Sequence, residues 1–341
     1  MTFDKSKSIY LEFYRGIAAF GVAICHYLAA HGSAGSEFSA VIFVEMFFPL
    51  SGFILAPQVL RIYQDRGSFK IFLMRRWIRT IPLYILGLIC VGFMTFNLSS
   101  PQFKQYFLFY HFLSTGYSIN NFYPVSWSLA VEEYYYILFP LFVFALPVGN
   151  LKSKTLAFIA LGFGIKVGMS YFVPHAFLRI ATYSRIDAIA IGFLFYLMMD
   201  RCNIRHLYLA LPLFIGAALA HYQRHNSAWA IAFIYSANIF FGLACALLYR
   251  REQRLPPFNV WFRRLATLIG AQSYSVYVFH IFVLGICMKA GLGILYYLFL
   301  VMIVSHFLHV YFEYPLMKMR PKYRNTQDAP MPVWKVKYEN S

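Results

Sequence analysis

The sequence predicts an all-α membrane protein, a polytopic bundle of about ten transmembrane helices with both termini in the cytoplasm. Of its 341 residues, 60% are hydrophobic and only 13% are charged, and a soluble domain cannot bury so much apolar side chain. The apolar residues gather into separate runs of membrane-spanning length. These runs give the candidate spans 9–30, 40–60, 80–97, 127–147, 155–173, 186–200, 206–222, 229–249, 267–289 and 292–314.

The first span, 9–30, contains the charged residues Glu12 and Arg15. A cleaved signal peptide avoids charges in its apolar core, so this run is predicted to remain in the membrane. The span 127–147 has the least regular pattern, because Glu132 and Glu133 interrupt it. Several other spans are short or contain Pro or Gly, which span interiors tolerate where neighbouring helices cover them.

The basic residues set the predicted orientation. With the N-terminus in the cytoplasm, 23 of the 30 Lys and Arg residues fall on the cytoplasmic side, five on the outer side and two within spans. This asymmetry follows the positive-inside rule. The net charge of +17 is therefore attributed to membrane topology, and nucleic acid is not expected as a partner.

The chain is predicted to form one transmembrane domain, residues 1–320, followed by a short cytoplasmic tail, residues 321–341. Four of the five cysteines lie in predicted spans, and no Cys-x-x-Cys pattern occurs. We therefore expect no disulfide framework and no cysteine metal site. His306, His309 and Glu313 share a helix face, but they do not form a known metal-ligand set, so no metal is expected.

Arg15 and His26 are separated by eleven residues within the first span. Eleven residues are about three helical turns, so both side chains project from one helix face, about 16 Å apart along the axis. Ionisable side chains inside a membrane usually face the bundle interior and serve function. Two structural alternatives remain: Arg15 paired with Glu12, and His26 as a hydrogen-bonded core histidine.

The predicted topology brings further polar residues toward the outer side of the membrane. Glu132 lies below the outer surface in the fourth span, and Arg185 and Asp187 stand at the outer mouth of the sixth. His280 lies beyond the midpoint of the ninth span. Together with His26, these residues are predicted to share an outward-facing polar cavity.

Arg75, Arg76 and Arg79 precede the third span on the cytoplasmic side. Their simplest interpretation is as topology anchors, and the alternative is as phosphate ligands. Lys166 is a single charge in the middle of the fifth span, for which the sequence offers no explanation.

Seven short motifs follow one another along nearly the whole chain. They are Arg15-x10-His26, Phe47-Phe-Pro-Leu-Ser-Gly-Phe-Ile54, Arg76-x-x-Arg79, Ser126-Trp-Ser-Leu-Ala-Val-Glu-Glu-Tyr-Tyr-Tyr136, Tyr183-Ser-Arg-Ile-Asp187, Ser273-Tyr-Ser-Val-Tyr-Val-Phe-His280 and Glu313-Tyr-Pro315. In this order they resemble acyltransferase family 3, the integral-membrane O-acyltransferases that modify bacterial surface glycans. Pro49 departs from the pattern, since Val or Ile is commoner there.

The resemblance implies transfer of an acyl group, usually acetyl, from cytoplasmic acyl-CoA to a hydroxyl of a glycan or glycolipid. Acetyl-CoA or another acyl-CoA is the implied donor, with no metal. The implied partners are this donor, a glycan or lipid-linked glycan, and membrane lipid, in the bacterial plasma (inner) membrane. The length resembles members that carry the membrane domain alone and act on exopolysaccharide, O-antigen, nodulation factor or antibiotics.

For catalysis, the resemblance points to His26 as the general base, since a neutral imidazole can accept the proton of a sugar hydroxyl. A carboxylate usually orients such a ring. Glu132 is the first candidate for this partner and Asp187 is the second. A covalent acyl intermediate on His26 or Ser51 is the alternative to direct transfer.

For binding, the resemblance assigns Arg15 to the pantetheine or phosphate end of the donor. Arg76 and Arg79 are assigned to the CoA phosphates, which guanidinium groups bind well. Substrate-binding roles are implied for Trp127, Ser128, Arg185, Tyr274 and His280.

Two other classes of function are alternatives to an acyltransferase. A proton-coupled transporter or flippase also uses intramembrane His, Arg and Glu residues. It predicts an inverted internal repeat, and the two halves of this sequence show no convincing similarity. A scaffold or sensor without catalysis leaves the predicted carboxylate–imidazole cluster unexplained.

Overall fold

A computed structural model describes residues 8–95, 98, 101–110, 113, 122–254 and 259–323. These residues form helices and loops and contain no strand, so the all-α prediction is confirmed. The helices are α1 (Ile9–Ala30), α2 (Ser36–Gln64), α3 (Ser68–Met94), α4 (Pro101–Phe107), α5 (Ser126–Ala145), α6 (Leu151–Met169), α7 (His175–Ile180), α8 (Ile186–Leu197), α9 (Ile204–Arg224), α10 (Ser227–Arg254), α11 (Val260–Lys289), α12 (Ile294–Leu308) and α13 (Tyr314–Lys318), with the short turns η1 (Thr182–Ser184), η2 (Met199–Arg201) and η3 (His309–Glu313).

Within the described residues, eight helices are long and apolar enough to cross a membrane, against about ten expected. They are α1, α2, α3, α5, α9, α10, α11 and the continuous segment Ile294–Lys318. The predicted spans 155–173 and 186–200 correspond to α6 and α8. α6 contains three lysines, and the 12 residues of α8 rise only about 18 Å, less than the roughly 30 Å of a bilayer core.

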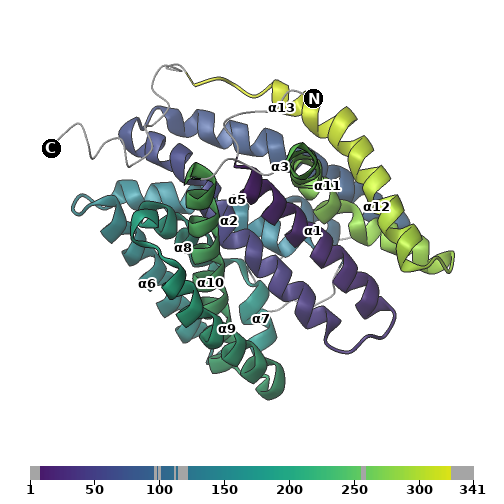
Figure 1. Cartoon of the computed structure of the whole chain (residues 1–341), viewed down its shortest axis with the longest axis horizontal. Helices are drawn as coiled ribbons and strands as arrows, with labels where there is room; N and C mark the ends of the chain where they lie inside the picture. The colour runs from purple at the N-terminus through teal and green to yellow at the C-terminus, as the bar shows by residue number, and fades with distance from the viewer. Residues whose placement is uncertain are drawn as a thin grey trace.

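The first two helices lie at the centre of the bundle. α1 packs against α2 and α11, and α2 also packs against α8 and α10. Figure 1 shows α6, α8, α9 and α10 on one side of this pair and α11 and α12 on the other. Residues of α1 and α2 are therefore surrounded by helices from later in the chain.

The bundle has two ends, which we name for the cavity residues described below. The arginine end holds the start of α1 and the end of α10, which are joined where the backbone N–H of Ile9 donates to Glu252 Oε1 over 2.8 Å. The histidine end holds the start of α7 and the end of α9, where the rings of His175 and His225 lie 6.0 Å apart between centroids. The predicted cytoplasmic tail, 321–341, begins at the arginine end, and its residues 324–341 lie outside the described part of the chain.

Helices α2 and α8 approach each other so closely that only glycine fits at two positions. A Cβ atom on Gly52 would lie 1.8 Å from the carbonyl oxygen of Ile189. A Cβ atom on Gly192 would lie 1.9 Å from the carbonyl oxygen of Pro49. Because both obstacles are backbone atoms, no rotamer change can relieve the overlap.

We expect Gly192→Ala to separate α2 from α8 and to lower the free energy of unfolding by about 1–3 kcal/mol or more. The thermal melting temperature of the purified protein in detergent measures this effect. Gly216→Ala on α9 is the matched control, since a Cβ atom there meets nothing within 4 Å. An unchanged melting temperature for Gly192→Ala would contradict the close α2–α8 contact.

Candidate functional site

Two cavities lie in the described part of the bundle, one toward each end. The arginine cavity has an empty volume of about 750 Å³, counted with the solvent space at its opening, and its lining includes Arg15, Arg76 and Arg79. The histidine cavity has an empty volume of about 1840 Å³, counted in the same way, and His26 lines it. Tyr277 lines both cavities, so they approach each other at this residue.

The arginine cavity gathers guanidinium groups from α1 and α3. Arg15 Nη1 lies 3.3 Å from Glu12 Oε1, so the structural pairing that the sequence left open is present. Arg15 nevertheless also lines the cavity. Arg76 and Arg79 take part in no ion pair within the described residues. Positive charge therefore exceeds negative charge on this wall, which suits an anionic ligand.

Glu132 lines the arginine cavity and forms its hydrogen bonds with residues other than His26. Its Oε1 accepts a hydrogen bond from Ser51 Oγ over 2.6 Å, and its Oε2 accepts one from the hydroxyl of Tyr136 over 2.7 Å. Both carboxylate oxygens are thus occupied by hydroxyl donors. The expected pairing of Glu132 with His26 does not occur.

The partner of His26 is His280, which is fully buried. His26 Nδ1 lies 2.8 Å from His280 Nε2, and His280 Nδ1 lies 2.8 Å from the carbonyl oxygen of Tyr277. A carbonyl oxygen only accepts hydrogen bonds, so the proton of neutral His280 is on Nδ1 and its Nε2 accepts. His26 Nδ1 must then be the donor. This assignment leaves the lone pair of His26 Nε2 free.

Imidazoles also gather at the mouth of the histidine cavity. The rings of His175 and His221 lie 6.1 Å apart between centroids, and Arg179 lines the same wall. Burial lowers the pKa of His175, and nearby His225 and Arg179 lower it further. The His175 ring is therefore neutral at pH 7 and can both donate and accept hydrogen bonds.

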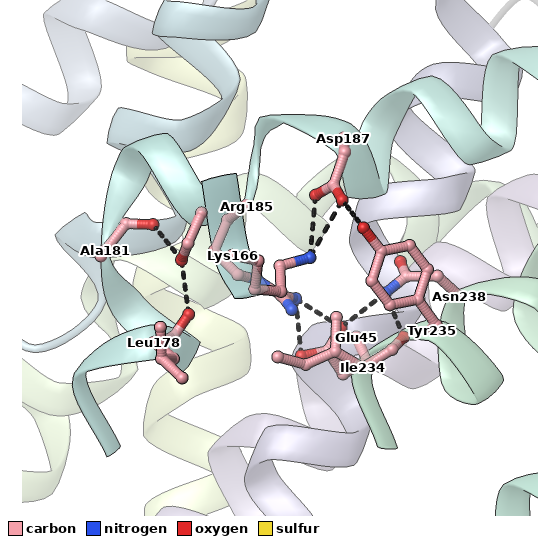
Figure 2. Close-up of polar contacts among 10 residues, drawn as sticks. Glu45, Lys166, Leu178, Ala181, Arg185, Asp187, Ile234, Tyr235 and Asn238 are labelled. Atoms are coloured by element: carbon pink, nitrogen blue, oxygen red, sulfur yellow. Dashed lines mark hydrogen bonds and ion pairs between the residues drawn. The ribbon is translucent and has the colours of Figure 1, made fainter. Parts of the chain in front are cut away.

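Asp187 does not reach either cavity. Lys166 Nζ lies 3.1 and 3.0 Å from its two carboxylate oxygens, and the hydroxyl of Tyr235 donates to the same carboxylate. Figure 2 shows this cluster between the helices. Both charged side chains are completely buried. The predicted place of Asp187 beside His26 is wrong, because Lys166 of α6 supplies the opposite charge that a buried carboxylate requires.

Arg185 is also taken up by a buried ion pair. Its Nη2 donates to Glu45 Oε1 and Oε2 over 2.7 and 2.5 Å, and Asn238 Nδ2 donates to Glu45 Oε2 over 3.1 Å. These contacts lie next to the Asp187 cluster in Figure 2. The sequence placed Arg185 in an outward-facing cavity, and the structure instead encloses it against α2.

The sequence matches the acyltransferase domain family over residues 8–314. The chain belongs to this acyltransferase family. A protein of Staphylococcus aureus (strain COL) named "Putative O-acetyltransferase" is 26% identical over an alignment of 207 residues that covers 53% of this chain and 33% of that relative. "Acyltransferase MdmB" of Streptomyces mycarofaciens is 28% identical over 146 residues, 37% of each chain.

The matched segments thus cover only about a third of the length of these two relatives. No solved structure matches the sequence. The family assignment itself rests on nearly the whole described chain, because the match begins at residue 8 and ends at residue 314.

Three more residues of the acyltransferase motifs line the cavities. Ser128 and Tyr274 line the arginine cavity, and the hydroxyl of Tyr274 donates to the carbonyl oxygen of Thr80 over 2.6 Å. Trp127 lines the histidine cavity. The predicted substrate-binding residues are therefore divided: Trp127, Ser128 and Tyr274 line the cavities, Arg185 is in a buried ion pair, and His280 is hydrogen-bonded to His26.

The motifs of this acyltransferase gave no site role to Tyr277, whose hydroxyl lies 2.6 Å from Ser128 Oγ. A signal was available, because Tyr277 precedes His280 by three residues and so shares its helix face. Glu45 was missed without such a signal. Its partner Arg185 is 140 residues away in the chain.

Proposed function

We propose that this protein is a membrane O-acyltransferase of the bacterial plasma membrane. It moves an acyl group, most simply acetyl, from cytoplasmic acyl-CoA to a hydroxyl of a glycan or lipid-linked glycan. The observation that carries the proposal is the pair of cavities at Tyr277. One offers cations for a phosphorylated donor, and the other offers His26 Nε2 as a base.

In this mechanism the donor enters at the arginine end, which the positive-inside rule assigns to the cytoplasm. Arg76 and Arg79 hold CoA phosphates through paired N–H donors. Arg15, farther along the cavity wall, guides the pantetheine arm. The thioester then lies near Tyr277, where the arginine cavity ends.

The acceptor occupies the histidine cavity. The indole of Trp127 and the ring of Tyr222 supply flat apolar faces in its lining, while the imidazoles at the mouth can bind hydroxyl groups. Such a combination of stacking faces and polar side chains suits a sugar. We therefore assign the acceptor glycan to this side of the protein.

Transfer occurs where the two cavities approach each other. His26 Nε2 removes the proton of the acceptor hydroxyl as its oxygen attacks the thioester carbonyl carbon. The C–S bond then breaks, and the CoA thiolate recovers a proton from the His26 imidazolium. The hydroxyls of Tyr277 and Ser128, 2.6 Å apart, can turn one hydrogen toward the developing oxyanion.

Glu132 has a supporting role on the donor side in this proposal. It fixes the hydroxyls of Ser51 and Tyr136 and contributes negative charge beside the cavity arginines. Ser51 Oγ donates to this carboxylate, and because a base beside a serine hydroxyl can activate it, an acyl-serine intermediate stays the alternative to direct transfer. Arg185 and Asp187 act through folding.

The test uses membranes that contain the protein, radiolabelled acetyl-CoA and the glycan fraction of the same bacterium. We expect label in the glycan and an equal release of CoA thiol, both dependent on the protein. Movement of a glycan across the membrane without CoA release would instead support the flippase alternative. If the folded protein gives no label in the glycan and releases no CoA, the proposed activity is excluded.

His280→Leu should lower the turnover number by about 10–100-fold, which corresponds to the loss of a hydrogen bond to a charged group. His280 positions the His26 ring and does not contact the donor, so the KM for acyl-CoA should stay unchanged. His280→Gln keeps an acceptor oxygen near the position of Nε2. It should restore most of the activity, and equal loss in both variants would indicate a purely structural role.

A further inference from the structure

The described chain continues past α13 and crosses α3 at the arginine end. Figure 1 shows this yellow C-terminal segment leaving α13 beside α3. Arg75 Nη1 donates to the carbonyl oxygen of Pro321 over 2.6 Å. The guanidinium carbons of Arg61 and Arg75 lie 4.4 and 5.1 Å from the ring centroid of Tyr323. The segment is thus held against the arginines of α2 and α3.

Arg320 adds another cation to this group. Burial, together with the nearby charges of Arg79, Arg75 and Arg76, lowers the pKa of Arg320 to about 10. Its Nε donates to the carbonyl oxygen of Met317 over 3.0 Å, which leaves the two terminal nitrogens for other ligands. The guanidinium groups of Arg75, Arg76, Arg79 and Arg320 therefore lie close enough to repel one another.

Glu132 lies in the same cavity lining, but no carboxylate forms an ion pair with this group within the described residues. None of Arg75, Arg76, Arg79 and Arg320 appears in an ion pair there, and none is fully exposed. The hydroxyl of Tyr323 and Nε of Arg75 are buried without a hydrogen-bond partner. Partly buried like charges are costly unless an anion joins them.

The cations also follow an order. Arg15, Arg76 and Arg79 line the arginine cavity. Arg75 and Arg320 lie outside this lining, since Arg75 contacts the C-terminal segment and Arg320 belongs to it. An acyl-CoA has the same order, with an uncharged pantetheine arm followed by a nucleotide that carries three phosphate groups. The far cations are therefore placed for the nucleotide end.

We propose that Arg320 and Tyr323 complete the donor site and bind the phosphates of the CoA nucleotide. This inference rests on the proposed function. The C-terminal segment 319–323 is then one wall of this site. The enclosed position of the guanidinium groups favours a single bound polyphosphate over a layer of anionic lipid headgroups, which would require exposed cations.

The test measures binding of CoA and of 4′-phosphopantetheine, which lacks the nucleotide, to the full-length protein in detergent by isothermal titration calorimetry. Arg320→Ala should weaken CoA binding by about 10-fold or more, the effect of losing a hydrogen bond to a charged group. Binding of 4′-phosphopantetheine should not change. Arg320→Lys and Tyr323→Phe should give smaller losses. The matched control is Arg251→Ala, an exposed arginine on α10.

The outcomes separate this inference from the proposed function. If the wild-type protein binds no CoA, the acyl-CoA donor itself is excluded. If Arg76→Ala weakens CoA binding and a folded Arg320→Ala variant does not, the donor site stands and the role of the C-terminal segment is overturned. If Arg320→Ala loses binding to phosphatidylglycerol vesicles and keeps its CoA affinity, the C-terminal segment binds lipid, and its role in the donor site is overturned.

Discussion

His26→Ala should lower the rate of acyl transfer by about 10²–10⁴-fold, the usual contribution of a positioned general base. The structure gives the reason. His26 donates through Nδ1 to His280 and keeps Nε2 free at the histidine cavity. Without this base, the acceptor hydroxyl must attack the thioester while it still carries its proton.

The measurement is label transfer from acetyl-CoA to glycan in membranes with matched amounts of protein. His31→Ala is the control, because His31 is an exposed residue that caps the same helix. It should retain full activity. Calorimetric CoA binding by His26→Ala should equal that of the wild type, since His26 does not line the arginine cavity. Wild-type transfer by His26→Ala would rule out its role as the base.

Lys166→Met should destabilise the protein by about 3–5 kcal/mol, because it leaves the carboxylate of Asp187 buried without a counter-charge. Lys166 and Asp187 are both completely buried. Because neither side chain touches solvent, water does not replace the lost partner. This is the largest stability effect that we expect from a single substitution.

The thermal melting temperature in detergent and the yield of monodisperse protein measure this loss. Lys152→Met is the matched control, because Lys152 is exposed on the same helix α6, and it should leave both values unchanged. The double variant Lys166→Met with Asp187→Leu removes both charges and should recover most of the stability. If Lys166→Met alone melts like the wild type, the buried ion pair does not stabilise the fold.

The two cavities divide the proposed reaction between the two ends of the bundle. Phosphate-binding cations lie at one end and imidazoles at the other, and Tyr277 lies between them. The ring of Tyr277 is 6.1 Å from that of His280, which is 5.1 Å from that of His26. This row of rings connects the proposed position of the thioester to the proposed base.

The sequence was sufficient for the helices and for the family. Apolar runs of span length predict membrane helices wherever they occur, because an unpaired backbone is too costly in lipid. The shortfall at 155–173 and 186–200 has a local cause, since the helix observed at the first, α6, contains three lysines and the helix observed at the second, α8, has only 12 residues. The shared face of Arg15 and His26 likewise needed only the period of one helix.

The partners of the polar side chains were decided by the tertiary structure alone. His26 meets His280 across 254 positions of sequence, and Arg185 meets Glu45 across 140. Which helices pack together determines these pairs, and periodicity within one helix carries no information about its neighbours. The sequence by itself determined eight of the ten predicted spans, the motif residues and the face on which Arg15 and His26 lie. Only the packing of the helices decided that an imidazole orients His26, because the two carboxylates expected there had closer partners.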